Sequence, residues 1–239
     1  MSEIIRSEVT AEELKIINSF ARADMKAEDV YAFRIVCCDN QIDRDFERFS
    51  DEAIAKMAEL YVGKTIIKDH LPSADNQIGR IYKTDVESGE NGSKRLVASA
   101  YIPKTESNIP IIENIESGVN KEVSVGCAVQ KRICSICGKD IQNCSHLKSK
   151  NYEGKVCYAL LDGVYDVYEL SFVAVPSQKS AGVIKSFKAM PDHQSAVIGI
   201  DLSSGDMTGE AAMVQNRIVQ SRLLCADLYN NLHLESEEN

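Results

Sequence analysis

One segment, CSICGKDIQNCSH, holds three cysteines and a histidine at spacings that allow them to converge on one metal ion. Cys134 and Cys137 are separated by two residues and followed by Gly138, and Cys144 precedes His146 by two positions. Such a turn directs two thiolates toward one point, and a second pair of ligands completes a tetrahedron suited to zinc. Four ligands leave no position for water, so we expect a structural zinc that folds a segment too small to bury its own core.

Cys157, in GKVCYA, is a fifth possible ligand and can replace His146. The alternative interpretation is a set of reduced cysteines without metal. Disulfides fit less well, because the N-terminal MSEIIRSEVTAEEL has neither the basic nor the apolar region of an export signal. We therefore expect a soluble protein made in a cytoplasm.

Length and charge narrow the function classes. The 239 residues can bury a sizeable core, and one or two domains are expected. The formal charge of −9 argues against nucleic acid as the main partner, because that affinity comes from clustered Lys and Arg. No stretch approaches the roughly 18 apolar residues of a membrane span, so no membrane association is expected.

Apolar periodicity predicts an α+β fold with many short strands. Helices are expected over 10–23, where Thr10 and Glu13 form a capping box, over 50–63, and within 106–118 after Pro110. The predicted strands are 29–38, 64–68, 77–86, 95–102, 121–129 and 164–176. Strands with a few helices packed outside indicate a small, mostly antiparallel β-barrel surrounded by helices, with the Cys/His segment inserted in it.

The apolar periodicity also divides the chain into three parts. Residues 1–27 form an N-terminal helical segment, and residues 28–185 form the main domain, with the zinc-binding insertion at 131–160. Residues 186–239 are expected to be a linker and a helix around 210–232, followed by a disordered acidic tail.

Three side chains on the predicted strands are candidates for chemistry. In KEVSVGCAV, alternation places Ser124 on one face with Gly126 and Ala128, which leaves the clearance that a nucleophile needs. His70 follows the strand KTIIK, at a strand end where functional side chains tend to project. Each also has an ordinary interpretation, as a strand serine beside a bulge glycine and as a turn histidine.

Glu169, in VYDVYELSFVAVP, is the third candidate. Alternation places it on one face with Ser171 and with Val167, Val173 and Val175, so the carboxylate lies in a mostly apolar row. A buried carboxylate is costly unless it is paired or hydrogen-bonded. The alternative is an ion pair with a nearby Arg or Lys.

Four blocks, in this order, resemble those of one protein family. DNQIDRDFERFS, IIKDH with QIGRI, VNKEVSVGCA and YELSFVAVPSQKSAGV are similar to the blocks of tailed-bacteriophage prohead (capsid maturation) serine proteases of the HK97-like kind. These are distantly related to herpesvirus assembly proteases. The resemblance covers about residues 28–185.

The resemblance implies a serine endopeptidase in which His70 is the general base and Ser124 the nucleophile. The implied substrate is the scaffolding region of the major capsid protein, or a separate scaffold protein, inside the immature capsid in the bacterial cytoplasm. Such proteases commonly also cut themselves, and here self-cleavage is expected between about residues 186 and 210. A homodimer remains open.

Two questions stay open at this stage. The residue that orients His70 is either Glu169 or His146, and we favour Glu169 because His146 belongs to the metal motif. Two other functions also remain possible. One is a zinc-dependent hydrolase, with His70 or Glu169 joining the cysteines, and the other is a catalytically inert capsid scaffold or binding module.

Overall fold

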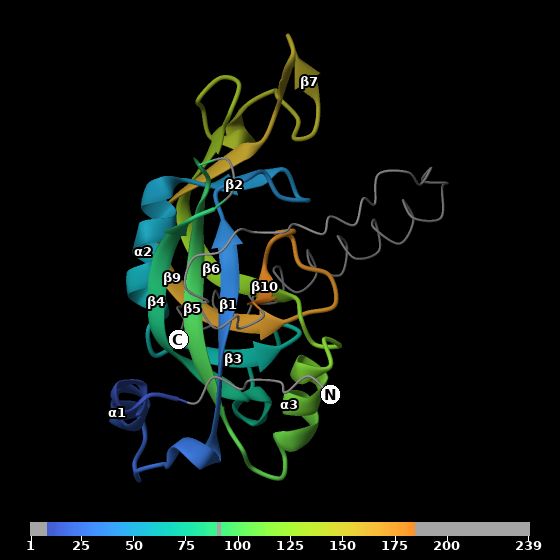
Figure 1. Ribbon diagram of the computed structural model, residues 1–239. Coiled ribbons are helices and arrows are strands. Elements are labelled where there is room, and N and C mark those ends of the chain that lie inside the picture. The colour runs from blue at the N-terminus through green and yellow to red at the C-terminus, as the bar shows by residue number, and fades with distance from the viewer. Residues whose placement is uncertain (1–8, 90–91, 185–239) are drawn as a thin grey trace, which may run out of the picture. The chain divides into compact units, whose positions relative to one another are not determined.

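One eight-stranded sheet forms the centre of the chain that the computed structural model describes, which is residues 9–89 and 92–184 (Figure 1). Its strands are β1 (Val30–Asp39), β2 (Glu47–Phe49), β3 (Thr65–Lys68), β4 (Gly79–Ser88), β5 (Lys94–Pro103), β6 (Val123–Cys134), β9 (Ala159–Phe172) and β10 (Gly182–Ile184). Two further strands, β7 (Asn151–Tyr152) and β8 (Lys155–Val156), form a separate hairpin.

Helices accompany the sheet, which confirms the mixed α+β class. Within the described ranges they are α1 (Ala11–Phe20), α2 (Asp51–Tyr61) and α3 (Ile109–Glu116), with short 3-10 turns η1 (Ala27–Asp29), η2 (Ala74–Asn76) and η4 (Ile141–Asn143). None of these helices is long and apolar enough to cross a membrane. The linker, helix and self-cleavage region expected beyond residue 185 lie outside the described residues.

The strand order is β10-β1-β5-β4-β3-β9-β2, with β6 paired to β9. Most neighbours are antiparallel, whereas β2 and β3 both run parallel to β9. The long strand β9 therefore pairs with β6 in one ladder, and with β2 and β3 near its two ends. This arrangement places β9, which carries Glu169, between β3, which leads to His70, and β6, which carries Ser124.

The predicted closed barrel is not found, because no continuous ladder joins the two ends of this strand path. In the described chain, the link between β10 and the β6 end is an isolated bridge between Glu122 and Gly182, with a bond from the Val183 N–H to the Lys121 carbonyl (2.8 Å). β10 has only three residues, which is too short for a full ladder. The structure is an antiparallel-rich sheet with helices outside it.

The main core lies between the sheet and α2. β1 contributes Phe33 and Ile35, and α2 contributes Ile54, Met57 and Tyr61, all of them buried. Figure 1 shows α2 along one side of the strands. A smaller cluster forms where α1 packs, and its buried members are Ile17, Val30, Tyr82 and Tyr101.

The ends of two elements differ from the prediction for local reasons. The capping box of Thr10 and Glu13 is confirmed, but α1 ends at Phe20 rather than 23. The Asn18 side chain exchanges two hydrogen bonds of 3.0 Å with the Met25 backbone and so draws the chain away from the helix. β9 ends at Phe172 rather than at residue 176, so Val173 and Val175 do not continue the row that contains Glu169.

Ser50 joins α2 to β9. Its hydroxyl accepts a hydrogen bond from the Ala53 N–H (3.0 Å) at the start of the helix and donates one to the Asp162 carboxylate (2.7 Å). That hydrogen bond, followed by one from the Gly163 N–H and by the charge of Lys131, lowers the pKa of Asp162. A lowered pKa means that Asp162 stabilises the fold above the ordinary carboxylate pKa of about 4, and that this contribution is lost as pH falls through the folded-state value.

We predict that Ser50→Ala lowers the free energy of unfolding by about 1–2 kcal/mol at neutral pH, because both bonds of the cap disappear. Urea unfolding at about pH 7 and about pH 3 should show a larger difference between wild type and variant at the higher pH. Ser73→Ala, at an exposed serine, is the control. An equal difference at both pH values would contradict the contribution of Asp162.

Candidate active site and metal centre

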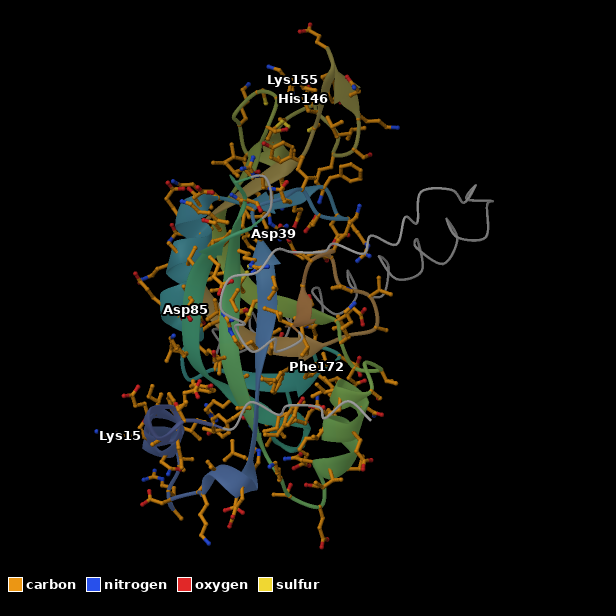
Figure 2. All side chains as sticks on the ribbon, in the orientation of Figure 1. Lys15, Asp39, Asp85, His146, Lys155 and Phe172 are labelled. Carbon is orange, nitrogen blue, oxygen red and sulfur yellow. The ribbon has the colours of Figure 1, made fainter. Side chains whose placement is uncertain are left out.

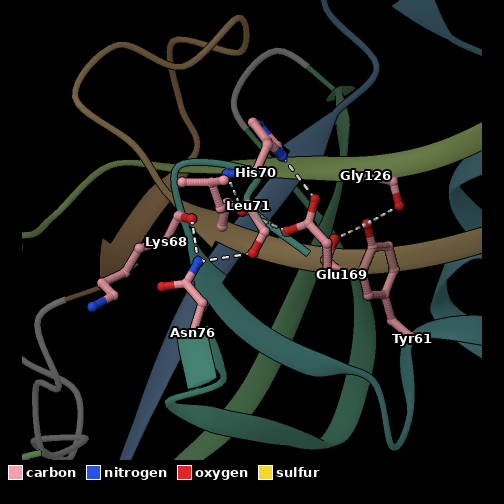
Figure 3. A network of polar contacts seen from close by, with 8 residues as sticks. Tyr61, Lys68, His70, Leu71, Asn76, Gly126 and Glu169 are labelled. Atoms are coloured by element: carbon pink, nitrogen blue, oxygen red, sulfur yellow. Dashed lines mark hydrogen bonds and ion pairs between the residues drawn. The ribbon is translucent and has the colours of Figure 1, made fainter. Parts of the chain in front are cut away.

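Glu169 is a buried carboxylate whose two oxygens each have a partner. The residue is 8% exposed. Its Oε1 lies 2.7 Å from His70 Nδ1, and its Oε2 accepts a hydrogen bond from the Ser171 hydroxyl at 2.5 Å (Figure 3). A carboxylate can only accept, so Nδ1 of His70 carries the proton and Nε2 is left as a free acceptor. Among the described residues Glu169 therefore pairs with His70 and not with an Arg or Lys, the alternative considered above.

His70 is held in an unusual backbone conformation two residues after β3. Asp69 and His70 have φ angles of 56° and 54°, in the left-handed region that residues with a Cβ rarely adopt. The Asp69 N–H donates to the Phe172 carbonyl (2.9 Å), and the Asn76 side-chain amide donates to the carbonyls of Lys68 and Leu71 (Figure 3). These bonds keep the strained turn in place and aim the imidazole at Glu169.

Ser171 connects Glu169 with His70. The sequence predicted only that Ser171 shares a face of its strand with Glu169. Its hydroxyl donates to Glu169 Oε2 and accepts the backbone N–H of His70 at 3.0 Å, and the residue is fully buried. One side chain thus fixes both the carboxylate and the histidine backbone. The available signal was the alternation that places Ser171 beside Glu169, but the bond to His70 depends on the parallel pairing of β3 with β9.

Tyr61 and Gly126 also contact Glu169, and the sequence did not predict either contact. The Tyr61 hydroxyl donates to the backbone carbonyls of Glu169 (3.1 Å) and Gly126 (3.3 Å), so α2 binds β9 and β6 together. Burial raises the pKa of Tyr61 well above its ordinary value, and the phenol therefore remains a neutral donor. A Cβ at Gly126 would lie 2.3 Å from Glu169 Oε1, so only glycine leaves room for the carboxylate.

Ser124 lies opposite Ser171 in the ladder between β6 and β9, and Gly126 lies opposite Glu169. The register therefore brings the Ser124 strand against the His70–Glu169 pair. The Ser124 hydroxyl has no hydrogen bond to any described residue, His70 included. Ser124 also lines a cavity of about 170 Å³, together with Phe49, Cys127 and others.

Regular alternation holds in β6 only up to Gly126. The register shifts between Gly126 and Cys127 and again between Ala128 and Val129, and the strand continues to Cys134. Ser124 and Gly126 share a face as expected, whereas Ala128 lies beyond the first bulge. Bulges are frequent beside functional sites because they re-aim side chains.

The four predicted metal ligands come together at the end of β6. One ligand atom each from Cys134, Cys137, Cys144 and His146 lies within 4.8 Å of the others. The Cys134-Gly138 turn is closed by a bond from the Gly138 N–H to the Cys134 carbonyl (2.9 Å), with φ of 71° at the glycine. The segment therefore has the geometry of a metal site.

His146 fits a ligand role better than a catalytic one. Its Nδ1 is buried and has no hydrogen-bond partner among the described residues, as expected for a nitrogen whose partner is a metal ion. The ring packs edge-on against Tyr152 at 4.6 Å, and it is Glu169, not His146, that contacts His70. Cys157 is outside the four-residue group, although its sulfur lies 3.8 Å from that of Cys134.

The thiols of Cys134 and Cys157 differ in acidity. Burial alone would raise the pKa of Cys134, but hydrogen bonds from the backbone N–H groups of Cys137 and Ile136 outweigh it and lower the pKa to about 6. Burial, with the neighbouring Cys134 sulfur, raises the pKa of Cys157 to about 11. Cys134 is thus prepared as a thiolate ligand, whereas Cys157 remains a thiol.

Comparison with protein-family models, with curated proteins and with solved structures finds no match to this chain.

We predict that Gly126→Ala separates Glu169 from His70, because the new methyl group would occupy the position of Oε1. Proton NMR of the wild type should show a strongly downfield imidazole N–H resonance from the short His70–Glu169 bond. The resonance should be absent in Gly126→Ala and in Glu169→Gln, and it should persist in the control Ser124→Ala. A wild-type resonance in Gly126→Ala would contradict the contact.

Proposed function

We propose that this chain is a serine endopeptidase in which Ser124 is the nucleophile, His70 the general base and Glu169 the residue that orients His70. The observation that supports it most is the 2.7 Å contact between His70 Nδ1 and the buried carboxylate of Glu169, whose strand β9 pairs with both β3 and the Ser124 strand β6. A carboxylate in this position fixes the tautomer of the histidine and stabilises the imidazolium that forms during proton transfer.

In this mechanism one proton moves from Ser124 through His70 to the leaving group, and Glu169 holds His70 in position. His70 Nε2 takes the Ser124 hydroxyl proton as Oγ attacks the substrate carbonyl carbon, and the proton then passes to the leaving amine as the peptide bond breaks. In the second half-reaction, His70 Nε2 takes a proton from water as the water oxygen attacks the acyl carbon. The proton then passes to Ser124 Oγ as the ester bond breaks. The hydrogen bond between Ser124 and His70 has to form when substrate binds, which is common for catalytic pairs.

Two alternatives have less support. A zinc-dependent hydrolase needs an open coordination position and His70 or Glu169 at the metal, but those two side chains contact each other, and the cysteine cluster has four ligands of its own. An inert scaffold would have no use for a left-handed His70 and a buried carboxylate, both of which cost stability.

The proposed substrate follows from the family resemblance of the four sequence blocks. We propose that the enzyme cleaves the scaffolding region of the major capsid protein, or a scaffold protein, inside the immature capsid, and also its own chain.

The metal proposed for the Cys134, Cys137, Cys144 and His146 group is zinc. Three thiolates and one imidazole suit zinc and fill its tetrahedral shell, so its role would be to stabilise the insertion. The insertion has little apolar core, since most of its side chains are exposed.

We predict that Ser124→Ala abolishes processing, with a loss of roughly a thousand-fold or more in rate, and that Glu169→Gln also lowers the rate by orders of magnitude. The assay is co-expression with the major capsid protein of the same genome, followed by intact-mass measurement. A serine-directed fluorophosphonate probe should label wild type but not Ser124→Ala. Ser73→Ala is the matched control, and normal processing by Ser124→Ala would refute the assignment.

We predict about one zinc per chain in purified protein. His146→Ala and Cys137→Ser should lower the zinc content and make the insertion sensitive to protease, because the insertion depends on the metal for its fold. Cys157→Ser should keep the metal. Full metal content in His146→Ala together with metal loss in Cys157→Ser would show that Cys157, not His146, is the fourth ligand.

A further inference from the structure

The metal-binding insertion differs in charge from the rest of the chain. Residues 131–160 contain six Lys or Arg and two Asp or Glu, a net charge of +4, whereas the whole chain has −9. All the other residues together therefore have a net charge of −13. A strong charge asymmetry of this kind indicates a segment that meets a partner of opposite sign.

Five of the six basic side chains fall into two groups, whereas Arg132, on β6, lines the cavity that also contains Ser124. Lys131 and Lys148 attach the insertion to the sheet, through Asp162 (3.9 Å) and Glu47 (2.9 Å). Lys139, Lys150 and Lys155 are exposed and form no ion pair with any residue of the described chain. The second group is free to meet a partner.

Apolar surface accompanies these lysines. Leu147 is 63% exposed and Val156 is 41% exposed. The insertion has little apolar core of its own in which these two side chains could be buried. A hollow of about 490 Å³ adjoins the metal group, and it is lined by Ile136, His146, Asn151, Tyr152, Glu153 and Lys155. Figure 2 shows Lys155 and His146 at the end of the molecule opposite Lys15.

We propose that this face of the insertion is a docking surface for an acidic segment of another protein, one that contains apolar side chains among its Asp and Glu residues. The lysines supply the charge complementarity, and Leu147 with the adjoining hollow receives an apolar side chain. Because the zinc proposed above would hold the insertion rigid, little ordering is needed on binding. The inference is independent of the proposed protease function.

Other occupants fit less well. Three unpaired lysines would neutralise few phosphates, and the net charge of −13 on the remainder would repel nucleic acid. A second copy of this chain has its sheet carboxylates paired, as Glu87 is with Arg34 and Arg95, whereas exposed unpaired ones of the described chain, such as Glu113 and Glu116, lie on α3. Self-association is therefore one of the outcomes that the test separates.

The test is fluorescence anisotropy with the full metal-bound chain carrying Ser124→Ala and a short labelled peptide of alternating glutamate and leucine. Binding should weaken as salt increases. Changing Lys139, Lys150 and Lys155 to glutamate should lower the affinity about tenfold or more, while the same change at the exposed Lys15, Lys121 and Lys179 should have little effect. Leu147→Ser should weaken binding of this peptide but not of a glutamate–glycine peptide.

Metal content and circular dichroism establish that each variant is folded. If the triple glutamate variant loses its metal, glutamine at the same three positions should give a smaller loss of affinity. Unchanged affinity in the folded triple variant would overturn the proposal. So would equal binding of a lysine–leucine peptide, tighter binding of single-stranded DNA, or self-association of the chain that these lysine changes abolish.

Discussion

The buried carboxylate of Glu169 is the constraint around which the central part of the structure is arranged. An ionised group taken out of water costs several kcal/mol unless hydrogen bonds replace the lost hydration, and both oxygens of Glu169 receive such bonds. Ser171 and His70 supply them, and Gly126 leaves the necessary space. The absence of a side chain at Gly126 and the left-handed backbone at His70 both follow from this one requirement.

Local sequence signals were enough for the parts of the structure that local chemistry decides. The capping box at Thr10, the start of a helix at residue 50 and the four residues of the metal group are short-range patterns, and each lies where expected. Glu169 stood out because a charged residue in an apolar row needs a partner. Glu169 was expected to orient His70 because His146 belongs to the metal motif, and the structure does bring the Glu169 and His70 side chains into contact.

Features that depend on long-range register were not predictable in the same way. The bond from the His70 N–H to Ser171 exists because β3 pairs parallel to β9 in one particular register, and no periodicity encodes that choice. Tyr61 looked like an ordinary core residue of a helix, and its two bonds to β6 and β9 appear only after packing. The bulges of β6 and the short β10, which leaves the sheet without a full closing ladder, likewise reflect tertiary contacts rather than propensity.

The parallel pairing of β3 with β9 also has a consequence for how the chain folds. His70 and Glu169 are 99 residues apart in sequence, and the segment between them includes β4, β5, α3, β6 and the metal-binding insertion. Loop-closure entropy makes contacts between residues so far apart in sequence slow to form, so local units such as the β4–β5 hairpin and the Cys/His insertion should become ordered earlier in folding. The candidate histidine and its carboxylate would then meet late, after most of the sheet exists, and a partly folded chain would lack the oriented imidazole.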